Sequence, residues 1–555
     1  MKVVEERKVE RRNFYSGDQT LQLILKETLH PDLLEFAKQE LGEFGHLTAH
    51  EIDVRAKHTD REGQPRLIKY DKYGEDVSEV WVNDGYRQSV KETYEKGIVG
   101  YIHKEIPELG KKGNYTYSFA QGYLLSQTEP GLYCPVTLTM ATAYLLDHYA
   151  DAELKARFLP HVCSTGDVEL YEGATFLTER QGGSDVGANA VEAIFENGCY
   201  RLYGEKYFAS NAGMCGVAMV LARIKGAAAG TKGLTLFAVP WRDDNGKLNG
   251  IRLRRLKDKL GVRAAPAGEV EFDGAIAYVV GEPEKGFYYM MEALNLSRIC
   301  NAVASIGIMR RAFIEARDYA DKRNAFGKRL NEFPMIQDTL GKLSAKLHVE
   351  TATVFDLIQL YEKVAEGKGT VEDEALNRLY IAIMKKETAE QAIHFSHEAI
   401  EMHGGNGYIE DFVTPRLLRD AQVLTVWEGT ANILGLELIR LVNKYKVHEL
   451  FIKEMRQRIN VLKESPIQQM VVEKLDEIDR KLEVFTRLDQ QQQTLEAKQL
   501  SKEMALFYES VIAVEWADRY SGRYEKLASV YLEDVWNLRS IGAPMKSVQW
   551  FEEIV

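Results

Sequence analysis

The pattern of apolar positions changes character twice along the chain. Up to about residue 165 apolar residues recur mostly at helical spacing, and Ala141, Leu145 and Tyr149 predict an amphipathic helix over 138–158. The stretch 60–74 is polar, contains glycine and has no periodicity, so we expect an exposed loop there. The N-terminal 165 residues are therefore expected to form a helical domain.

Between about 170 and 280 the pattern becomes that of short strands. Runs rich in β-branched or alternating residues are separated by glycine and Asp/Asn clusters. They are ATFLT at 174–178, VEAIF at 191–195, VAMVLA at 217–222, LTLFAV at 234–239 and EVEF at 269–272. This pattern predicts an antiparallel β-domain, a sandwich or a barrel, over 166–286.

From about residue 287 helical periodicity returns and continues to the end of the chain. One apolar stripe comprises Val303, Ile306, Met309, Phe313, Ala316 and Ala320. Three further stripes lie in 452–462, 471–485 and 500–514, and their alternating steps of three and four are typical of packed helices. We expect a helical bundle over 287–440 and an extra helical domain over 441–555, with the glutamine run 490–493 at a helix junction.

Composition and charge narrow the function classes. A chain of 555 residues is long enough for two to four domains. The net charge of −12 argues against a surface that coats nucleic acid. There is no uninterrupted apolar run of ~18 residues, which a membrane span needs. The start, MKVVEERKVERR, lacks the apolar core of a signal peptide, so we expect a cytoplasmic protein.

The pattern of cysteines indicates neither disulfides nor a metal site. Their number is odd, their spacing is wide, and no C-x-x-C pair occurs among Cys134, Cys163, Cys199, Cys215 and Cys300. This usage fits a reducing compartment and argues against disulfides and a structural zinc site. No metal is expected, and each thiol is interpreted as a small core side chain.

Several short motifs, far apart in the chain, occur together. They are LTERQGGSDV at 177–186, GEKYFASN at 204–211, RNAFG at 323–327, HGGNGY at 403–408 and VWEGT at 426–430. Together they resemble the acyl-CoA dehydrogenase superfamily over roughly residues 100–440, as does the order of helices, β-domain and helical bundle. The long N-terminal region and the extra C-terminal helices are similar to the longer branch that includes AidB. RLKDKLGVR at 255–263 and WEGTANI at 427–433 agree with that branch.

Removal of a proton α to a carbonyl requires a carboxylate base, donors for the developing enolate and a hydride acceptor. No side chain accepts hydride, so a redox cofactor is needed. The resemblance implies FAD as cofactor and Glu428 as base, with the Glu428 backbone N–H among the enolate donors. Trp427 is expected to exclude water and to raise the pKa of the base.

The position of the base has one rival in the family. Some relatives carry the catalytic Glu directly before an arginine on an earlier helix, and here that pair is Ser297 and Arg298. No acid is present there, which leaves Glu428. Arg298 is expected to orient substrate and base, although a buried structural cation is an equally good interpretation.

The resemblance also implies the cofactor contacts. Phe208 stands where many members place Trp against the flavin, and Ser210 stands where they use Thr. Ser184 is expected at a cofactor phosphate and as a substrate contact. Arg323 and Phe326 are expected to come from a neighbouring subunit, so the site requires a homo-oligomer, a dimer or a homotetramer. The full expected set is Leu177, Thr178, Gly183, Ser184, Phe208, Ser210, Arg323, Phe326, Gly404, Gly405, Thr430 and Asn432.

The expected reaction is desaturation of an acyl-CoA between C2 and C3, as in fatty acid metabolism, with an electron-transferring flavoprotein as acceptor. An alternative is an AidB-like flavoprotein with a protective or an acyl- or DNA-binding role and weak dehydrogenase activity. Residues 441–555 hold 17 Lys/Arg and 19 Asp/Glu, which disfavours DNA binding. An acyl-CoA oxidase is another alternative, whereas a nitroalkane-oxidising relative would use Asp as base. The acyl chain length, for which Tyr123, Leu132 and Tyr133 are candidate determinants, stays open.

Overall fold

The computed structural model describes residues 13–520 and 522–555. The chain forms two compact units, 1–300 and 301–555, and the division falls within the long helix α9 (Gly286–Lys322). No helix among the described residues is long and apolar enough to cross a membrane. The expectation drawn from the first twelve residues, that they are no leader sequence, lies outside the described residues.

The first unit begins with helices, as predicted. They are α1 (Gln19–Thr28), α2 (Pro31–Leu47), α3 (Asp53–Arg61), α4 (Asp84–Glu95), α5 (Gly100–His103), α6 (Tyr115–Ser126), α7 (Pro130–Tyr149) and α8 (Ala152–Val162). The single helix predicted over 138–158 is wrong, because α7 ends at Tyr149 within that range and α8 begins at Ala152. Asp151 causes the break: its backbone is extended and its side chain accepts the N–H of Leu154 at 2.9 Å, which caps α8.

The predicted loop over 60–74 is also wrong in part. Strand β1 (Arg66–Tyr70) pairs antiparallel with β2 (Asp76–Trp81) to form a hairpin. The polar, glycine-containing residues between the strands make its turn, where Asp71 Oδ1 accepts the N–H groups of Tyr73 and Glu75. The predicted turn is therefore present, and the flanking strand β1 is short, with exposed residues alternating with partly exposed ones. Two smaller strands, β3 (Glu105–Ile106) and β4 (Lys111–Lys112), form a second hairpin.

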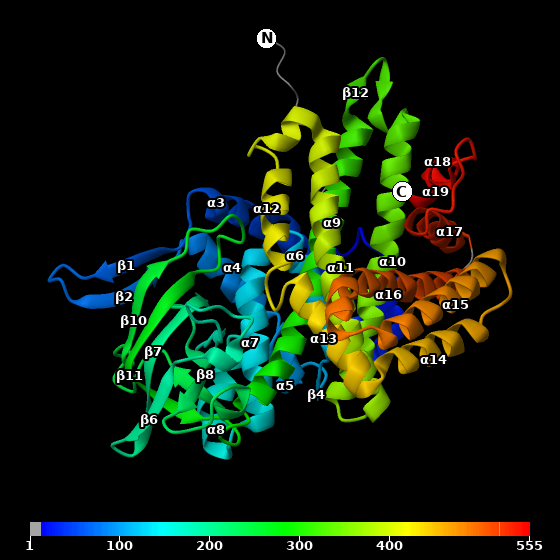
Figure 1. Ribbon diagram of the computed structural model, residues 1–555. Coiled ribbons are helices and arrows are strands. Elements are labelled where there is room, and N and C mark those ends of the chain that lie inside the picture. The colour runs from blue at the N-terminus through cyan, green and yellow to red at the C-terminus, as the bar shows by residue number, and fades with distance from the viewer. Residues whose placement is uncertain (1–12, 521) are drawn as a thin grey trace, which may run out of the picture. The chain divides into compact units, whose positions relative to one another are not determined.

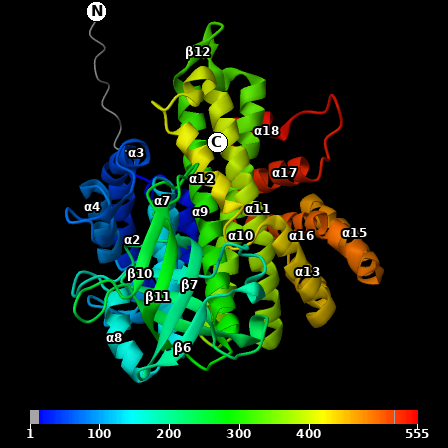
Figure 2. The same ribbon diagram turned by 60° about the vertical axis from the view of Figure 1, so that its left-hand side comes forward.

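The β-region is one seven-stranded sheet that closes on itself, and Figure 2 shows part of it. Its strands are β5 (Gly173–Phe176), β6 (Glu192–Glu196), β7 (Cys199–Ser210), β8 (Val217–Ile224), β9 (Leu234–Pro240), β10 (Ile251–Leu256) and β11 (Ala267–Val279). Strand β9 pairs with both β8 and β11, so β11, β7, β6, β8 and β9 form a ring. Most pairs are antiparallel as expected, but β8 pairs parallel with β5 and β6.

The second unit is a helical bundle (Figure 1). After α9 come β12 (Asn324–Ala325) and β13 (Lys328–Arg329), then α10 (Pro334–Ala365), α11 (Val371–His403), α12 (Thr414–Leu424), α13 (Ala431–Tyr445), α14 (Val447–Asn460), α15 (Pro466–Arg487), α16 (Gln490–Arg519), α17 (Arg523–Val535), α18 (Lys546–Gln549) and α19 (Phe551–Ile554). The predicted apolar stripes of α9, α15 and α16 are buried throughout. The predicted junction near the glutamine run is confirmed, since α15 ends and α16 begins there.

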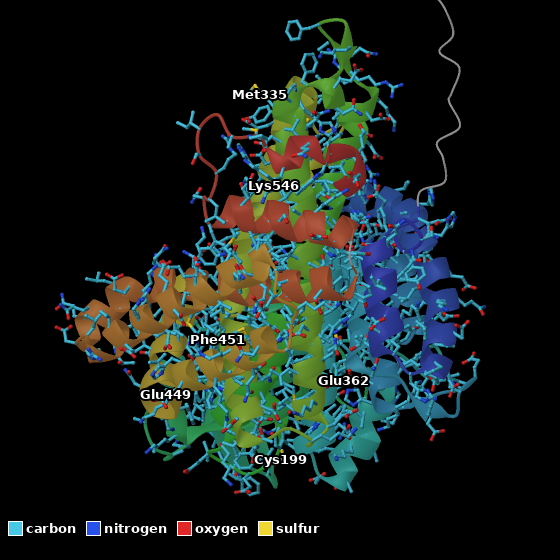
Figure 3. The ribbon with its side chains drawn as sticks, turned by 90° about the vertical axis from the view of Figure 1, so that its right-hand side faces the viewer. Cys199, Met335, Glu362, Glu449, Phe451 and Lys546 are labelled. Carbon is cyan, nitrogen blue, oxygen red and sulfur yellow. The ribbon has the colours of Figure 1, made fainter. Side chains whose placement is uncertain are left out.

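The extra C-terminal helices are attached to the bundle through buried charges. Lys346 on α10 lies 3.0 Å from Glu387 on α11 and 2.7 Å from Glu509 on α16. At the chain end, Ser547 donates to Asp338 near the start of α10. Figure 3 shows Lys546 of this segment beside the Met335 end of α10, while Glu362 lies at the other end of that helix. The division into four domains predicted from sequence stays a prediction.

All five cysteines are free thiols, and all but Cys199 are buried. Burial raises the pKa of Cys163 to about 12. The described residues contain no group of three or more His, Cys, Asp or Glu side chains that could hold a metal ion.

Candidate active site

The first unit positions the segment 177–186, which directly follows β5. Its backbone is attached to β7, because the Thr178 carbonyl accepts the N–H of Tyr207 at 2.9 Å. The Leu177 carbonyl accepts from the side chains of Asn189 at 2.8 Å and Lys206 at 3.2 Å. Strand order and side-chain donors together hold this segment beside the C-terminal part of β7.

A buried ion pair anchors the same segment. Lys206 Nζ lies 2.8 Å from Glu179 Oε1, and both side chains are almost fully buried. The Glu179 carboxylate also accepts the N–H groups of Ala190 and Val191. Burial lowers the pKa of Lys206 to about 8, and the attraction of Glu179 offsets part of that effect. Lys206 and Glu179 thus hold the segment 177–186 from its buried side.

The exposed face of the segment is a glycine turn folded back on Thr178. Gly182 has φ +128°, a conformation that strongly favours glycine. A Cβ on Gly183 would lie 2.5 Å from Thr178 Oγ1, so the close approach also requires glycine there. Ser184, the next residue, is exposed. The structure therefore brings Leu177, Thr178, Gly183 and Ser184 together, as their sequence proximity predicted.

An apolar side chain stands exposed next to this turn. Phe208 on β7 is 57% exposed, whereas the next residue, Ala209, is buried, and Phe208 follows the residue that bonds Thr178. Its ring contacts that of Tyr207 edge-on, and Lys257 Nζ lies 4.9 Å from the Phe208 ring centroid. Ser210 ends the strand two residues later and is half-buried. This face offers a flat apolar surface with hydroxyls at its edge.

Arg298 lies on α9 near the end of the first unit. Its side chain is 6% exposed and donates to Asn295 Oδ1 at 3.0 Å. Ser297 beside it is buried. Burial of Arg298 fits both the orienting and the structural interpretation, and the choice between them stays a prediction.

The second unit positions Glu428 in the loop 425–430, between α12 and α13. Glu428 has φ +53° and the following Gly429 has φ +108°. A left-handed backbone at a non-glycine residue costs of order 1–3 kcal/mol and persists only where other contacts enforce it. Thr430 occupies the N-cap of α13 without a side-chain capping bond, and Asn432 is exposed in the first turn.

Two buried polar side chains enforce that loop. Asn301 Nδ2, from α9, donates to Glu428 Oε2 at 2.9 Å and to the Leu424 carbonyl at 3.1 Å. Lys385 Nζ, from α11, donates to the Gly429 carbonyl at 2.9 Å. Glu428 itself is half-buried, and so is Trp427. The carboxylate is consequently held on one side and partly accessible on the other.

The remaining expected residues form a separate group at one end of the bundle. Phe326 is 96% exposed at the tip of the β12–β13 hairpin, and Arg323 at the hairpin's base is exposed as well. The turn 403–408 lies at the same end, because Asn406 donates to Tyr319 Oη at 3.1 Å and the tilted rings of His403 and Tyr319 have centroids 4.1 Å apart. Figures 1 and 2 both place this hairpin away from α13. Within one chain, Arg323 and Phe326 therefore do not join the Glu428 loop.

The glycines of the turn 403–408 have two different roles. A Cβ on Gly404 or Gly405 would meet nothing within 4 Å, so their backbone is open to a ligand. A Cβ on Gly407 would lie 2.5 Å from the Ile400 carbonyl, so that glycine is required by packing. His403 is buried and its ring bonds the Ala399 carbonyl, so its side chain packs against α11.

Family models match most of the chain. The AidB N-terminal domain matches residues 5–166, the acyl-CoA dehydrogenase middle domain 174–275, and the acyl-CoA dehydrogenase C-terminal domain 284–442. Acyl-CoA dehydrogenase family member 11 of Caenorhabditis elegans is 33% identical over 77% of this chain and 70% of its own length. The chain belongs to the acyl-CoA dehydrogenase family. Escherichia coli AidB, a putative acyl-CoA dehydrogenase, is 32% identical over 68% of this chain and 69% of its own, which places the chain in the AidB-like branch.

Solved structures agree with this family and its fold. The crystal structure of C. elegans ACDH-11 in complex with C11-CoA has a TM-score of 0.88 and 28% identity, and covers 96% of this chain and 93% of its own. The apo-form of Bd2924 has a TM-score of 0.83 and 32% identity, and covers 91% of this chain and 98% of its own. The predicted fold class, helical with a central β-region and an extra helical C-terminal region, is confirmed.

Sequence reasoning missed the side chains that support the expected residues. Lys206 stands inside the quoted GEKYFASN motif, but nothing in the motif indicated a buried partner at Glu179. Asn301 is a polar residue beside the predicted apolar stripe of 303–320, and that position was the available signal for a buried polar contact. Nothing in the sequence indicates a buried role for Lys385, because the residues directly after it in the chain are also charged.

Proposed function

We propose that this protein is an FAD-dependent acyl-CoA dehydrogenase in which Glu428 removes the α proton of an acyl-CoA thioester. The observation that supports this most strongly is the Glu428 carboxylate itself. It is half-buried, it sits in a left-handed loop enforced by Asn301 and Lys385, and it lies in the segment matched by the family's C-terminal domain. A similar protein of known structure, ACDH-11, binds C11-CoA.

The exposed groups of both units fit the chemistry of FAD. An isoalloxazine ring is flat and apolar with polar edges, which suits Phe208 with the hydroxyls of Thr178 and Ser210. The open backbone at Gly404 and Gly405 and the Arg323 guanidinium suit a pyrophosphate. We assign the isoalloxazine contacts to Leu177, Thr178, Gly183, Phe208 and Ser210, and further cofactor contacts to Ser184, Arg323, Phe326, Gly404, Gly405, Thr430 and Asn432.

Bound FAD supplies the acceptor for the hydride that leaves the β carbon. The remaining steps belong to the chain. Glu428 in its ionised form takes the α proton and becomes a neutral carboxyl, while the electron pair of that C–H bond enters the new C2–C3 double bond. The Glu428 backbone N–H stabilises the thioester oxygen as negative charge develops there. Arg298 orients the substrate, and Trp427 excludes water from the base.

The redox cycle and the assembly complete the proposal. Loss of the α proton and the β hydride leaves a 2,3-enoyl-CoA. The two electrons then pass to an electron-transferring flavoprotein and not to oxygen. Arg323 and Phe326 act on the FAD of a neighbouring subunit in a homo-oligomer, since the hairpin that carries them lies away from α13 in its own chain. We propose a cytoplasmic enzyme of fatty acid metabolism.

The decisive test is anaerobic flavin bleaching of the purified protein by a panel of acyl-CoA thioesters. The wild type is expected to lose its flavin absorbance with at least one chain length. Glu428→Gln keeps the shape of the side chain but cannot accept a proton, so it should retain FAD and lose bleaching by at least about 10³-fold. Glu496→Gln, the same change at an exposed position of α16, should behave like the wild type.

The competing functions give different results in the same preparation. Bleaching by Glu428→Gln at the wild-type rate would refute the role of Glu428. Rapid peroxide formation in air would identify an acyl-CoA oxidase. Absence of bleaching with every thioester, together with a salt-dependent gel shift at submicromolar protein, would favour the AidB-like protective role.

A further inference from the structure

Asn301 occupies an unusual place for an amide. It lies on α9 beside the predicted apolar stripe and is only 4% exposed. Its Nδ2 donates to Glu428 Oε2 at 2.9 Å and to the Leu424 carbonyl at 3.1 Å. One side chain thus contacts both the last residue of α12 and the carboxylate four positions later.

The oxygen of the same amide indicates that the contact with Glu428 is functional. Among the described residues, Asn301 Oδ1 is buried and has no hydrogen-bond partner. An unsatisfied buried acceptor destabilises the folded state, because it loses its hydrogen bonds to water. An aliphatic residue of similar size would avoid that cost in a helix whose neighbouring positions Ile299, Ala302 and Val303 are apolar and buried. The amide instead contributes the two hydrogen bonds that its Nδ2 donates to Glu428 and Leu424.

Glu428 needs such a contact for two reasons. Its backbone is left-handed, so without an enforcing contact the loop would relax and move the carboxylate. A hydrogen bond to a carboxylate also favours the ionised form over the neutral one, and only the ionised form can take a proton. Lys385 supports the same loop through its bond to the Gly429 carbonyl, whereas Asn301 Nδ2 bonds the carboxylate itself.

We infer that Asn301 is the positioning residue of the base: its amide sets the location of the Glu428 carboxylate and keeps it ionised. This inference rests on the proposed role of Glu428. It assigns the carboxylate's orientation to a side chain 127 positions away on α9. Asn301 itself neither accepts the proton nor contacts the cofactor in this assignment.

The test is the pH dependence of turnover in two variants of the FAD-loaded enzyme. Asn301→Leu removes the donor at similar volume, and Asn301→Asp replaces it with a second acid. Both should lower kcat about tenfold or more with little change in KM for the acyl-CoA. The acid limb of the kcat/KM profile should move up by about one pH unit in Asn301→Leu. It should move further in Asn301→Asp, because a neighbouring negative charge disfavours ionisation of the base.

The matched control is Asn377→Leu on α11. Asn377 is 5% exposed and, among the described residues, its Oδ1 likewise lacks a partner, but it precedes Lys385, the α11 residue that bonds the 425–430 loop, by about two helical turns. This variant should keep the wild-type profile even if it loses stability. If Asn301→Leu folds poorly, the near-isosteric Asn301→Asp is the variant that tests the proposal.

The outcomes separate the two proposals. An inactive Glu428→Gln alongside Asn301 variants with wild-type kcat and an unmoved acid limb would overturn the positioning role alone. An active Glu428→Gln would overturn the base assignment, and the Asn301 inference with it. A loss of kcat with an unmoved acid limb, equal in Asn301→Leu and Asn377→Leu, would reduce Asn301 to a packing residue.

Discussion

At the scale of single residues, Glu172 is a buried carboxyl of the first unit. It directly precedes β5, it is 4% exposed, and Tyr94 Oη donates to its Oε1 at 3.2 Å. Burial raises the pKa of Glu172 to about 7, and the bond from Tyr94 opposes only part of that rise. In the unfolded chain the same carboxyl ionises near pH 4.5, so the folded state binds the proton more tightly.

This difference in pKa determines how the free energy of unfolding changes with pH. Between about pH 4.5 and 7 the folded protein holds more protons than the unfolded chain, so the free energy of unfolding falls as pH rises. The loss reaches up to about 3 kcal/mol above pH 7. Glu172→Gln cannot ionise and should therefore gain stability relative to the wild type on going from pH 5 to pH 8. Thermal unfolding midpoints of both proteins across this range measure the effect, and parallel curves would contradict it.

At the scale of elements, the Lys206–Glu179 pair joins β7 to the segment 177–186. Removing one partner of a buried pair leaves an uncompensated charge and costs about 3–5 kcal/mol. Lys206→Met should therefore lower the unfolding midpoint and loosen the turn that holds Thr178, so that FAD is lost on gel filtration. Lys206→Met combined with Glu179→Gln should recover much of the stability, because no buried charge remains unpaired. Lys247→Met, at an exposed position, should change neither quantity.

The elements also show what a single sequence can and cannot predict. The runs 217–222 and 234–239 became β8 and β9 because continuous apolar stretches bounded by turn residues are buried strands. The parallel pairing of β8 with β5 and β6 was missed, since pairing partners leave no local pattern. The break at Asp151 was missed for a different reason: apolar spacing continued across it, and the cap outweighed the periodicity. Glu428 was recognisable from its motif. Its partner Asn301 lies 127 positions earlier in the chain, and only the packing of the helices brings the two side chains together.

At the scale of the whole molecule, the expected cofactor residues fall into groups carried by different elements. Phe208 and Thr178 belong to the first unit, Glu428 to the loop before α13, and Arg323 to the hairpin at one end of the bundle. A fully exposed phenylalanine at a hairpin tip is costly in a lone chain, because apolar surface is left in water. That exposure supports the proposal that a neighbouring subunit covers Phe326 and uses Arg323.

Mixed oligomers of two inactive chains test this proposal. Arg323→Ala is expected to weaken FAD retention at the neighbour's site, and Glu428→Gln removes the base from its own site. When differently tagged chains carrying one change each are co-expressed and purified through both tags, a site with intact Glu428 can receive Arg323 from its partner. About half of the sites in such a heterodimer should then bleach with acyl-CoA, whereas neither homo-oligomer should bleach at the wild-type rate. Lys322→Ala, an adjacent exposed cation, should leave its homo-oligomer active. If Arg323 instead served its own chain, every site in the mixed oligomer would lack either the arginine or the base, and no activity would return.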